Sequence, residues 1–375
     1  MEKRWIWQQE EWPAFEWDES LIQPRLRAVR LKQGVLIGRA GAVSTEDDQA
    51  AALDTLLENI ITSSAIENES LNVESVRSSL AKRLGISEYA SYAVSDRSEG
   101  LAKMMVDAIQ GCDQPLSVVR LLQWHRWLFP KGGTLLHPVS SGKLRGEEVM
   151  QVVSGRVERP TVHFEAPPRA RLEEELERFI TWYNQSEKRD GLLRAAIAHF
   201  WLITIHPFED GNGRITRALS DMVLARSDSQ SILLYSISST LLQQRKSYYE
   251  VLEQHQRGGV DITLWIQWFL DRLEEAVEQA LDKVDRTLFN SRYWQQHRQT
   301  ALNREQIKVL NRLLEGGERG VEQGISASQY QKVAKVSKAT ATRHLKELLE
   351  KGCVEKLSGG GRSTRYQIRS RMQER

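Results

Sequence analysis

The sequence predicts a mainly α-helical protein with one small β-hairpin and a separate basic domain at its C-terminal end. Apolar side chains recur at helical spacing along the 375 residues, for example over residues 192–205 and 214–225. A segment bounded by prolines, residues 161–168, is typical of a hairpin. The charge is uneven, because residues 304–375 hold 16 Lys and Arg against 8 Asp and Glu, a net charge of +8 in a chain whose net charge is +2.

The N-terminal part of the chain combines tryptophans with an amphipathic helix. Residues 5–17, WIWQQEEWPAFEW, alternate aromatic and other side chains, a pattern that predicts a short hairpin followed by a helix. We expect the tryptophans to pack in a core, because large aromatic side chains gain most from burial. Residues 53–68, LDTLLENIITSSAIEN, show the apolar spacing of an amphipathic helix.

A polar run, HPFEDGNGRITR at residues 206–217, joins two segments that the apolar spacing predicts to be buried helices. Because glycine tolerates positive φ and has no side chain, Gly211 and Gly213 let successive backbone N–H groups face an anion where the second helix begins. The positive end of the helix dipole lies at the same place. Arg214 and Arg217 are three residues apart, so they share one helix face and can clamp further phosphates.

Two more side chains of this run suit phosphate chemistry. Asp210 supplies a hard oxygen ligand of the kind that Mg2+ requires when it bridges phosphates. His206 is the only group of the run that can take a proton near neutral pH. Any one of these residues alone would fit an ordinary helix-loop-helix corner, but the complete set predicts a phosphate site with a base beside it.

The run resembles the HxFx(D/E)GNGRxxR motif of the Fic family, helical enzymes that mostly transfer AMP from ATP to a hydroxyl group on another protein. The resemblance implies that His206 is the base that deprotonates a target Ser, Thr or Tyr, that Phe208 anchors the loop in the core, and that Asp210 binds Mg2+. Relatives that act as kinases carry Lys in place of Gly213, so glycine favours AMP transfer. The residues that the resemblance assigns to the ATP phosphates are Gly211, Asn212, Gly213, Arg214 and Arg217.

Two further segments are similar to other parts of this family. Residues 141–152, SGKLRGEEVMQV, and residues 161–168, TVHFEAPP, resemble the loop and the β-hairpin flap that cover the target peptide. The flap residues are Val162, His163 and Phe164, and a surface hairpin without this role is the alternative. Tyr248 and Tyr249, in RKSYYEVLEQHQ, resemble residues that close the adenine side of the ATP site, although aromatic residues at this spacing also pack in cores.

A second motif lies upstream of the phosphate site. Residues 63–68, SSAIEN, match the (S/T)xxxE(G/N) inhibitory motif of the Fic family, with Ser63 and Glu67 at its defined positions. If this helix docks beside the phosphate site, the resemblance implies that Glu67 pairs with Arg217 and takes the place of the γ-phosphate, so that ATP binds only in an unproductive pose. The alternative is a solvated glutamate on a helix surface, the usual position of this residue type.

Composition excludes several classes of protein. No stretch approaches the roughly 20 apolar residues of a membrane-spanning helix, and the N-terminal residues do not lead into the apolar part of a signal peptide. We therefore expect a cytoplasmic protein that makes no membrane contact. Cys112 and Cys353 are the two cysteines, which excludes a disulfide framework and a cysteine-rich metal site.

The basic C-terminal segment predicts a further domain. Residues 304–317, 326–336 and 337–352 have helical patterns, and a hairpin with a Gly/Arg-rich tip is predicted after them. This order resembles a winged helix-turn-helix domain, whose third helix enters the major groove of duplex DNA. A protein-docking module of the same fold is the alternative. The residues that the resemblance assigns to DNA are Lys338, Thr340, Thr342 and Arg343 of the third helix, and Arg362 and Arg365 of the wing.

The chain is therefore predicted to have three parts: residues 1–95 with the inhibitory helix, residues 96–290 as the Fic catalytic bundle, and residues 300–375 as the winged helix-turn-helix domain. The predicted reaction is Mg2+-dependent AMP transfer from ATP to a protein hydroxyl group, inhibited by Glu67. Two alternatives stay open. One is a DNA-binding regulator whose Fic part senses ATP, and the other is a relative that removes AMP or transfers phosphate or another nucleotide. The sequence also leaves open whether the chain forms a homodimer.

Overall fold

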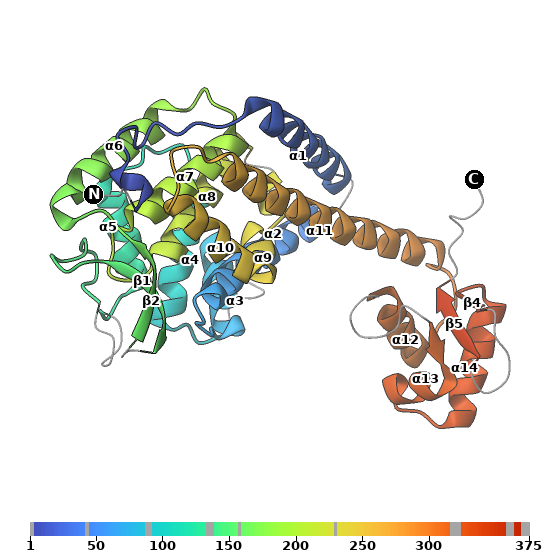
Figure 1. The fold of residues 1–375 in the computed structure, drawn as a ribbon. Coiled ribbons are helices and arrows are strands. Elements are labelled where there is room, and N and C mark those ends of the chain that lie inside the picture. Colours follow the sequence, from blue (N-terminus) through green and yellow to red (C-terminus); the bar gives the residue numbers. More distant parts are fainter. Residues whose placement is uncertain are drawn as a thin grey trace. The chain divides into compact units, whose positions relative to one another are not determined.

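The computed structural model has the mainly helical fold that the sequence predicts and divides the chain into two compact units. The units comprise residues 1–281 and 282–375, and Figure 1 shows their elements. The three-part division expected from the sequence stays a prediction. The residues that the structure describes are 4–41, 45–86, 92–132, 139–156, 159–228, 231–315, 324–357 and 364–368.

The first unit consists of helices and one two-stranded hairpin, formed by β1 (Gln151–Arg156) and β2 (Arg159–Glu165). Short 3-10 turns lie at Ile6–Gln8, Arg169–Arg171 and Ser231–Leu233. A long helix, α11 (Thr263–Gln296), begins in the first unit and ends in the second. The other helices of the first unit are α1 (Glu19–Ala40), α2 (Thr45–Ile66), α3 (Val73–Leu84), α4 (Asp96–Gln110), α5 (Val118–Leu128), α6 (Leu172–Gln185), α7 (Gly191–Ile205), α8 (Asn212–Ser227), α9 (Ile237–Gln243) and α10 (Arg245–Gln256).

Helices α7 and α8 lie at the centre of the first unit. Every residue of α7 is buried, because a helix that is apolar on almost all sides cannot lie at a surface. Helix α8 packs along α7, and α2, α4 and α5 pack against α8 (Figure 1). Both helices expected beside the polar run are confirmed, so the loop between them is held in a packed frame.

The hairpin expected within residues 5–17 is wrong, because the segment forms a 3-10 turn at Ile6–Gln8. The Gln8 side chain accepts hydrogen bonds from the backbone N–H groups of Arg4 and Trp5, at 2.8 and 3.0 Å. This local contact removes donors that a paired strand would need. The helix expected after the segment is present as α1.

Trp5, Trp7 and Trp12 of this segment are buried, as expected, whereas Trp17 is only half-buried. Trp7 donates from its indole nitrogen to the carbonyl O of Glu165, at the end of β2, over 2.7 Å. Trp12 donates to the Glu175 carboxylate in α6 over 2.8 Å. Because a buried indole N–H needs an acceptor, these contacts hold the N-terminal segment against the base of the hairpin and against α6.

Within residues 304–315, 324–357 and 364–368, the second unit combines helices with a small antiparallel sheet of order β3-β5-β4. Ser326 and Ser337 cap α13 and α14 through their side chains. Helices and hairpin thus lie where the sequence predicts them, whereas the winged helix-turn-helix class stays a prediction. The elements are α12 (Arg304–Glu315), β3 (Ile325–Ser326), α13 (Ala327–Ala334), α14 (Lys338–Glu350), β4 (Val354–Lys356) and β5 (Arg365–Ile368).

The structure also bears on the two cysteines and on membrane-spanning helices. Cys112 and Cys353 are both buried with free thiols, one in each unit. In the part of the chain that the structure describes, no helix is both long and apolar enough to cross a bilayer.

Replacing Gly100 of α4 with alanine should destabilise the first unit. A Cβ atom at this position would lie 1.9 Å from the carbonyl O of Trp127 in α5, so the two helices could not keep their close approach. We expect the free energy of unfolding to fall by about 1–3 kcal/mol. Thermal melts followed by circular dichroism measure the change.

Gly38→Ala in α1 is the matched control, since a Cβ atom there meets nothing within 4 Å. Alanine in a helix is favoured over glycine by roughly 0.5–1 kcal/mol. The Gly38→Ala melting temperature should therefore equal or exceed that of the wild type. A Gly100→Ala melt that matches the control would show that α4 and α5 do not touch at this point.

Candidate active site

His206 stands where α7 ends and the polar loop begins. Its backbone is left-handed, with φ 52° and ψ 61°, and Pro207 removes the N–H that a continuing helix would use. The ring nitrogen Nδ1 lies 3.1 Å from the carbonyl O of Ile203. Because a carbonyl oxygen only accepts, Nδ1 carries the hydrogen of the neutral ring and Nε2 presents a lone pair.

Burial controls the protonation of His206. Removal from water lowers the pKa of its imidazole to about 4, and the contact with the Ile203 carbonyl opposes this shift only in part. The ring is therefore neutral at physiological pH. Nε2 can then accept a proton, as a general base must.

Close packing and one amide contact fix the loop between α7 and α8. Gly211 has φ 83°, and a Cβ atom there would lie 2.6 Å from Leu128 and 2.8 Å from the Phe129 ring, so the position requires glycine. The Asn212 side chain accepts from the Phe208 N–H at 3.0 Å and donates to the Phe208 carbonyl at 2.8 Å. The Asn212 amide thus braces the loop and leaves the backbone N–H groups at the start of α8 to face an anion.

Two side chains outside the motif also brace the loop. His125 of α5 accepts from the N–H of Gly142 at 2.9 Å and lies 3.2 Å from the carbonyl O of Asp210. Burial lowers the His125 pKa to about 4, so the neutral ring accepts at Nδ1 and donates at Nε2. Arg145 donates to the carbonyl O of His206 at 3.0 Å. A single sequence gives no signal for these contacts, because the partners are backbone atoms.

Arg214 and Arg217 lie on the first two turns of α8 and are only 4 and 1% exposed. A buried guanidinium group needs anionic or polar partners. Arg217 donates to the hydroxyl and the carbonyl O of Ser63 and to Oε1 of Glu67, each at 2.8 Å. Its Nη1 atom has no hydrogen-bond partner among the described residues and would lie 3.0 Å from a Cβ atom on Gly213. One buried donor of Arg217 therefore lies beside the loop without a partner among the described residues.

The end of α2 determines where Glu67 points. Asn68 follows the helix with φ 58°. The backbone N–H of Asn68 donates to the carbonyl O of Ala65 at 3.0 Å. The backbone N–H of Glu69 donates to the carbonyl O of Ser64, also at 3.0 Å. This is a Schellman ending, which favours glycine or asparagine because the residue after the helix needs positive φ. The inhibitory motif has Gly or Asn after its glutamate, and in this chain the positive φ of Asn68 explains that preference.

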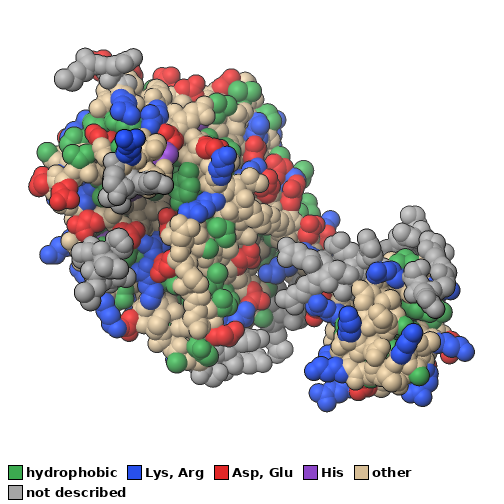
Figure 2. Space-filling model, turned by 60° about the horizontal axis from the view of Figure 1, so that its bottom comes forward, with side chains coloured by type: hydrophobic (Ala, Val, Ile, Leu, Met, Phe, Trp, Pro, Cys, Tyr) green, Lys and Arg blue, Asp and Glu red, His purple; other side chains and the backbone are tan. Residues whose placement is uncertain are grey.

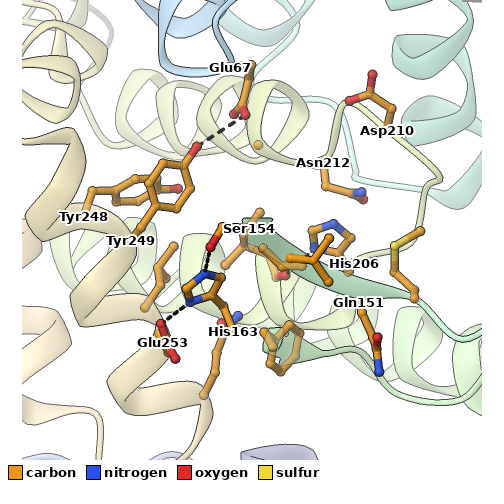
Figure 3. A pocket seen from close by; sticks show the side chains of 18 of the residues that line it. Glu67, Gln151, Ser154, His163, His206, Asp210, Asn212, Tyr248, Tyr249 and Glu253 are labelled. Atoms are coloured by element: carbon orange, nitrogen blue, oxygen red, sulfur yellow. Dashed lines mark hydrogen bonds and ion pairs between the residues drawn. The ribbon is translucent and has the colours of Figure 1, made fainter. Parts of the chain in front are cut away.

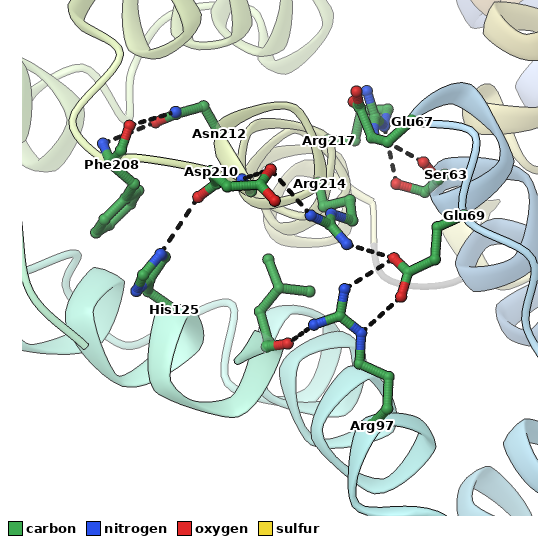
Figure 4. Close-up of polar contacts among 12 residues, drawn as sticks. Ser63, Glu67, Glu69, Arg97, His125, Phe208, Asp210, Asn212, Arg214 and Arg217 are labelled. Carbon is green, nitrogen blue, oxygen red and sulfur yellow. Dashed lines mark hydrogen bonds and ion pairs between the residues drawn. The ribbon is translucent and has the colours of Figure 1, made fainter. Parts of the chain in front are cut away.

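Glu67 occupies the space directly against the glycine loop. Its Oε1 atom would lie 2.1 Å from a Cβ atom on Gly213, and the Tyr249 hydroxyl lies 3.4 Å from Oε2. Burial by itself would raise the Glu67 pKa, but the charge and hydrogen bond of Arg217 outweigh burial and hold the pKa below its usual value. The structure therefore brings Ser63, Glu67 and Arg217 together, as Figure 4 shows.

A second carboxylate, which the motifs did not point to, lies between two arginines. Glu69 accepts from Arg97 of α4 at 2.7 and 2.8 Å and also accepts from Arg214. Burial would raise the Glu69 pKa, but both arginines lower it below the usual value. The only sequence signal is a second glutamate two residues after Glu67. Its partners are 28 and 145 positions away, so the sequence alone could not identify them.

Strands β1 and β2 pair antiparallel and form the hairpin expected beside the site. Of the three residues expected to meet a target, Phe164 packs in the core. His163 lies 2.6 Å from both the Ser154 hydroxyl and the Glu253 carboxylate, so it links β2 to β1 and α10. Val162 is half-buried and lies outside the cavity lining. The predicted target contacts of these residues stay a prediction.

A cavity of about 700 Å³ lies between the loop, the hairpin and α10, as Figure 3 shows. Its volume is within the roughly 300–1,000 Å³ of small-molecule sites. Tyr248 lines it but is 1% exposed, and its hydroxyl lies 2.9 Å from Nε2 of His199. Tyr249 is more open to the cavity, at 37% exposed. The residues of the predicted site that line the cavity are Glu67, His163, Phe164, His206, Asp210, Gly211, Asn212, Gly213, Tyr248 and Tyr249.

Asp210 is the carboxylate that the sequence predicts to bind Mg2+ at the loop. Its side chain is 56% exposed and lies 3.2 Å from Nη2 of Arg214. Among the described residues, no three His, Cys, Asp or Glu side chains form a metal-binding cluster. Mg2+ usually binds through one or two carboxylates together with phosphates. A single exposed carboxylate beside an anion cradle therefore fits an ion that arrives with ATP.

The residues predicted to contact DNA lie in the second unit. Thr340 is half-buried in the first turn of α14, and Arg365 donates to the carbonyl O of Gly324 at 3.0 Å. Arg362 lies outside the described residues. The exposed members of this set are Lys338, Thr342 and Arg343.

Two stretches of the chain match known protein families. Residues 115–224 match the Fic/DOC family, and residues 5–86 match a domain of unknown function, DUF4172. The Fic/DOC match contains the loop, Arg214 and Arg217. The other match contains Glu67 and Glu69.

Curated relatives are similar over about 270 residues. Protein adenylyltransferase Fic of Drosophila ananassae is 25% identical over 274 residues, which cover 70% of this chain and 49% of that relative. The protein of the same name from Drosophila melanogaster is 26% identical over 271 residues, with the same coverage of 70 and 49%. The chain thus spans about half the length of the curated relatives it matches.

Solved structures share the fold. A Fic family protein from Desulfovibrio desulfuricans G20 aligns over 93% of this chain and 97% of its own, with a TM-score of 0.52 and 20% identity. A Fic domain containing signaling protein from Bacteroides thetaiotaomicron VPI-5482 aligns over 69% of this chain and 95% of its own, with a TM-score of 0.50 and 20% identity. Residues 115–224 of the chain therefore form a domain of the Fic/DOC family.

Proposed function

We propose that the chain transfers AMP from ATP to a hydroxyl group of a target protein and that Glu67 inhibits this transfer. One arrangement carries the proposal: a neutral His206, with Nε2 able to accept a proton, lies beside a glycine loop followed by two buried arginines. The relatives named protein adenylyltransferase support the same chemistry. The cytoplasmic location stays a prediction.

In the proposed reaction, the target hydroxyl oxygen attacks the α-phosphorus of ATP. The bond from the α-phosphorus to the oxygen that bridges the β-phosphate breaks, pyrophosphate leaves, and the hydroxyl proton passes to Nε2 of His206. The first N–H groups of α8, Arg214 and Arg217 stabilise the negative charge on the phosphates. Mg2+ held by Asp210 would supply further charge neutralisation.

The position of the transferred label separates this reaction from its alternatives. AMP transfer incorporates label from α-labelled ATP and none from γ-labelled ATP, whereas phosphate transfer gives the opposite result. Removal of AMP would release label from a target that already carries it. A regulator that only senses ATP would incorporate no label at all.

His206→Ala should abolish α-label incorporation while ATP still binds. The reason is that Nε2 is the proposed proton acceptor, whereas the phosphate contacts come from the loop and the arginines. We expect a loss of at least about a hundredfold in rate. The measurements are α-label incorporation into a cell lysate and calorimetric titration with ATP. A folded variant that keeps the wild-type rate would rule out His206 as the base.

Glu67→Gly should raise α-label incorporation, including self-modification, because the carboxylate no longer occupies Arg217 and the space against Gly213. A charge-assisted hydrogen bond contributes about 1.5–3 kcal/mol, so a rise of roughly ten- to a hundredfold is expected. Adding Arg217→Ala should remove much of this gain, since both changes act through one contact.

The comparison uses wild type, each single variant and the double variant at matched concentration. Arg217→Ala alone controls for loss of a phosphate contact in a chain that keeps the Glu67 carboxylate. Equal rates for wild type and Glu67→Gly would mean that Glu67 is not inhibitory.

The second unit supports a second candidate function, the binding of duplex DNA. One side of α14 packs in the core through Ala341, Leu345 and Leu348, so its other side faces solvent. Figure 2 shows Lys and Arg side chains on the visible face of this unit. From residue 304 onward, the exposed cations among its described residues are Arg304, Lys308, Lys332, Lys335, Lys338, Arg343, Lys346, Lys351 and Lys356.

The full chain should therefore bind duplex DNA with steep salt dependence. Replacing Lys338 and Arg343 with alanine should weaken binding and reduce the slope of log affinity against log salt by about 2, since each phosphate contact contributes about 0.9. Replacing the exposed Arg27 and Lys188 of the first unit is the control with equal charge change. If the chain does not bind DNA even at low salt, a protein-docking role is favoured.

A further inference from the structure

A carboxylate shared by two guanidinium groups lies next to the glycine loop. Glu69 accepts two hydrogen bonds from Arg97 and one from Arg214. The Glu69 and Arg97 side chains are 25 and 26% exposed, but that of Arg214 is only 4% exposed. Figure 4 shows Glu69 between the two guanidinium groups.

This contact reaches the glycine loop through Phe129. The guanidinium carbons of Arg97 and Arg214 lie 4.9 and 5.2 Å from the centroid of its ring. Arg97 also donates to the carbonyl O of Leu128. Leu128 and Phe129 are the residues that pack against Gly211. The end of α2, α4, the end of α5 and α8 therefore meet around one carboxylate.

The charges distinguish Glu69 from Glu67. Glu67 and Arg217 form a pair without net charge, so Glu67 neutralises the arginine that it contacts. Glu69 is shared by two arginines, and these three groups keep a net positive charge. Glu69 therefore reduces the repulsion between two neighbouring cations without neutralising both of them.

Arg214 also has one donor without a partner among the described residues. It uses Nη1 for Glu69 and Nη2 for Asp210, whose carboxylate is largely exposed. Its Nε atom is buried and has no hydrogen-bond partner among the described residues. A buried donor without a partner costs free energy, which an arriving anion would recover.

We propose that Glu69 and Arg97 are positioning residues that hold Arg214 against the glycine loop for the phosphates of ATP, an inference that rests on the proposed AMP transfer. Glu69 supports ATP binding, whereas Glu67 opposes it, although only one residue separates them. Replacement of Glu69 should then weaken ATP binding, whereas replacement of Glu67 should favour it.

The test uses the full chain with Glu67→Gly, to which Glu69→Gln or Arg97→Gln is added. Glu69→Gln keeps the size of the side chain and removes its charge. Each addition should raise the KM for ATP and the Kd for ATP from calorimetry roughly five- to tenfold, with a smaller change in kcat. The two replacements together should raise the KM and Kd for ATP only slightly more than either one alone, because both act through one contact.

Glu99→Gln is the matched control. Glu99 of α4 is 33% exposed and accepts hydrogen bonds from Arg83 and Ser79, so it resembles Glu69 in burial and pairing but contacts neither Arg214 nor the loop. Its replacement should lower the melting temperature to a similar extent as Glu69→Gln. It should leave the KM and Kd for ATP unchanged.

Two results would overturn the positioning role. In the chain that keeps Glu67, a rise in α-label incorporation on Glu69→Gln would make Glu69 a second inhibitory residue. In the Glu67→Gly chain, unchanged ATP affinity in Glu69→Gln and Arg97→Gln, with only lower melting temperatures, would make the contact merely structural. Calorimetry does not need AMP transfer. A chain that binds ATP but incorporates no label would count against the proposed reaction alone, and the ATP affinities would still decide the role of Glu69.

Discussion

Two buried guanidinium groups govern the arrangement of the site. Arg214 and Arg217 lie inside the first unit because α8 packs against α7, α2, α4 and α5, and a buried cation is costly unless an anion pairs with it. The segment that follows α2 supplies one carboxylate to each arginine, Glu67 and Glu69. Phosphates are anions as well. In the proposed function, inhibition and catalysis therefore both use Arg217.

The frame of the site could be predicted from the sequence because it depends on local patterns. The segment 192–205 is apolar on almost all sides, so a buried helix is the one regular structure that fits it. The residue types of the loop follow from its backbone, since Gly211 takes positive φ against two packed side chains. Asn68 follows the same rule at the end of α2. The contact between Glu67 and Arg217 was expected only through the resemblance to a family.

The supports of this frame could not be predicted, because they join residues that are far apart in the sequence. Glu69 meets Arg97 and Arg214 only after three helices pack together. His125 bonds to backbone atoms, which every residue offers, so no pattern marks its partners. The alternation in residues 5–17 was misleading for a related reason. Trp7 and Trp12 bond to acceptors on β2 and α6, and no strand pairing is involved.

The ending of α2 has a consequence for how a signal could reach the site. Glu67 and Arg217 belong to one chain, and the Schellman ending fixes the Glu67 carboxylate at the loop. The fold therefore sets the effective concentration of this carboxylate at Arg217, and dilution of the protein does not change it. A tethered partner of this kind is hard for a freely diffusing ligand to displace. If Glu67 inhibits, the chain would respond weakly to the supply of nucleotide and strongly to any binding event that moves the last turn of α2.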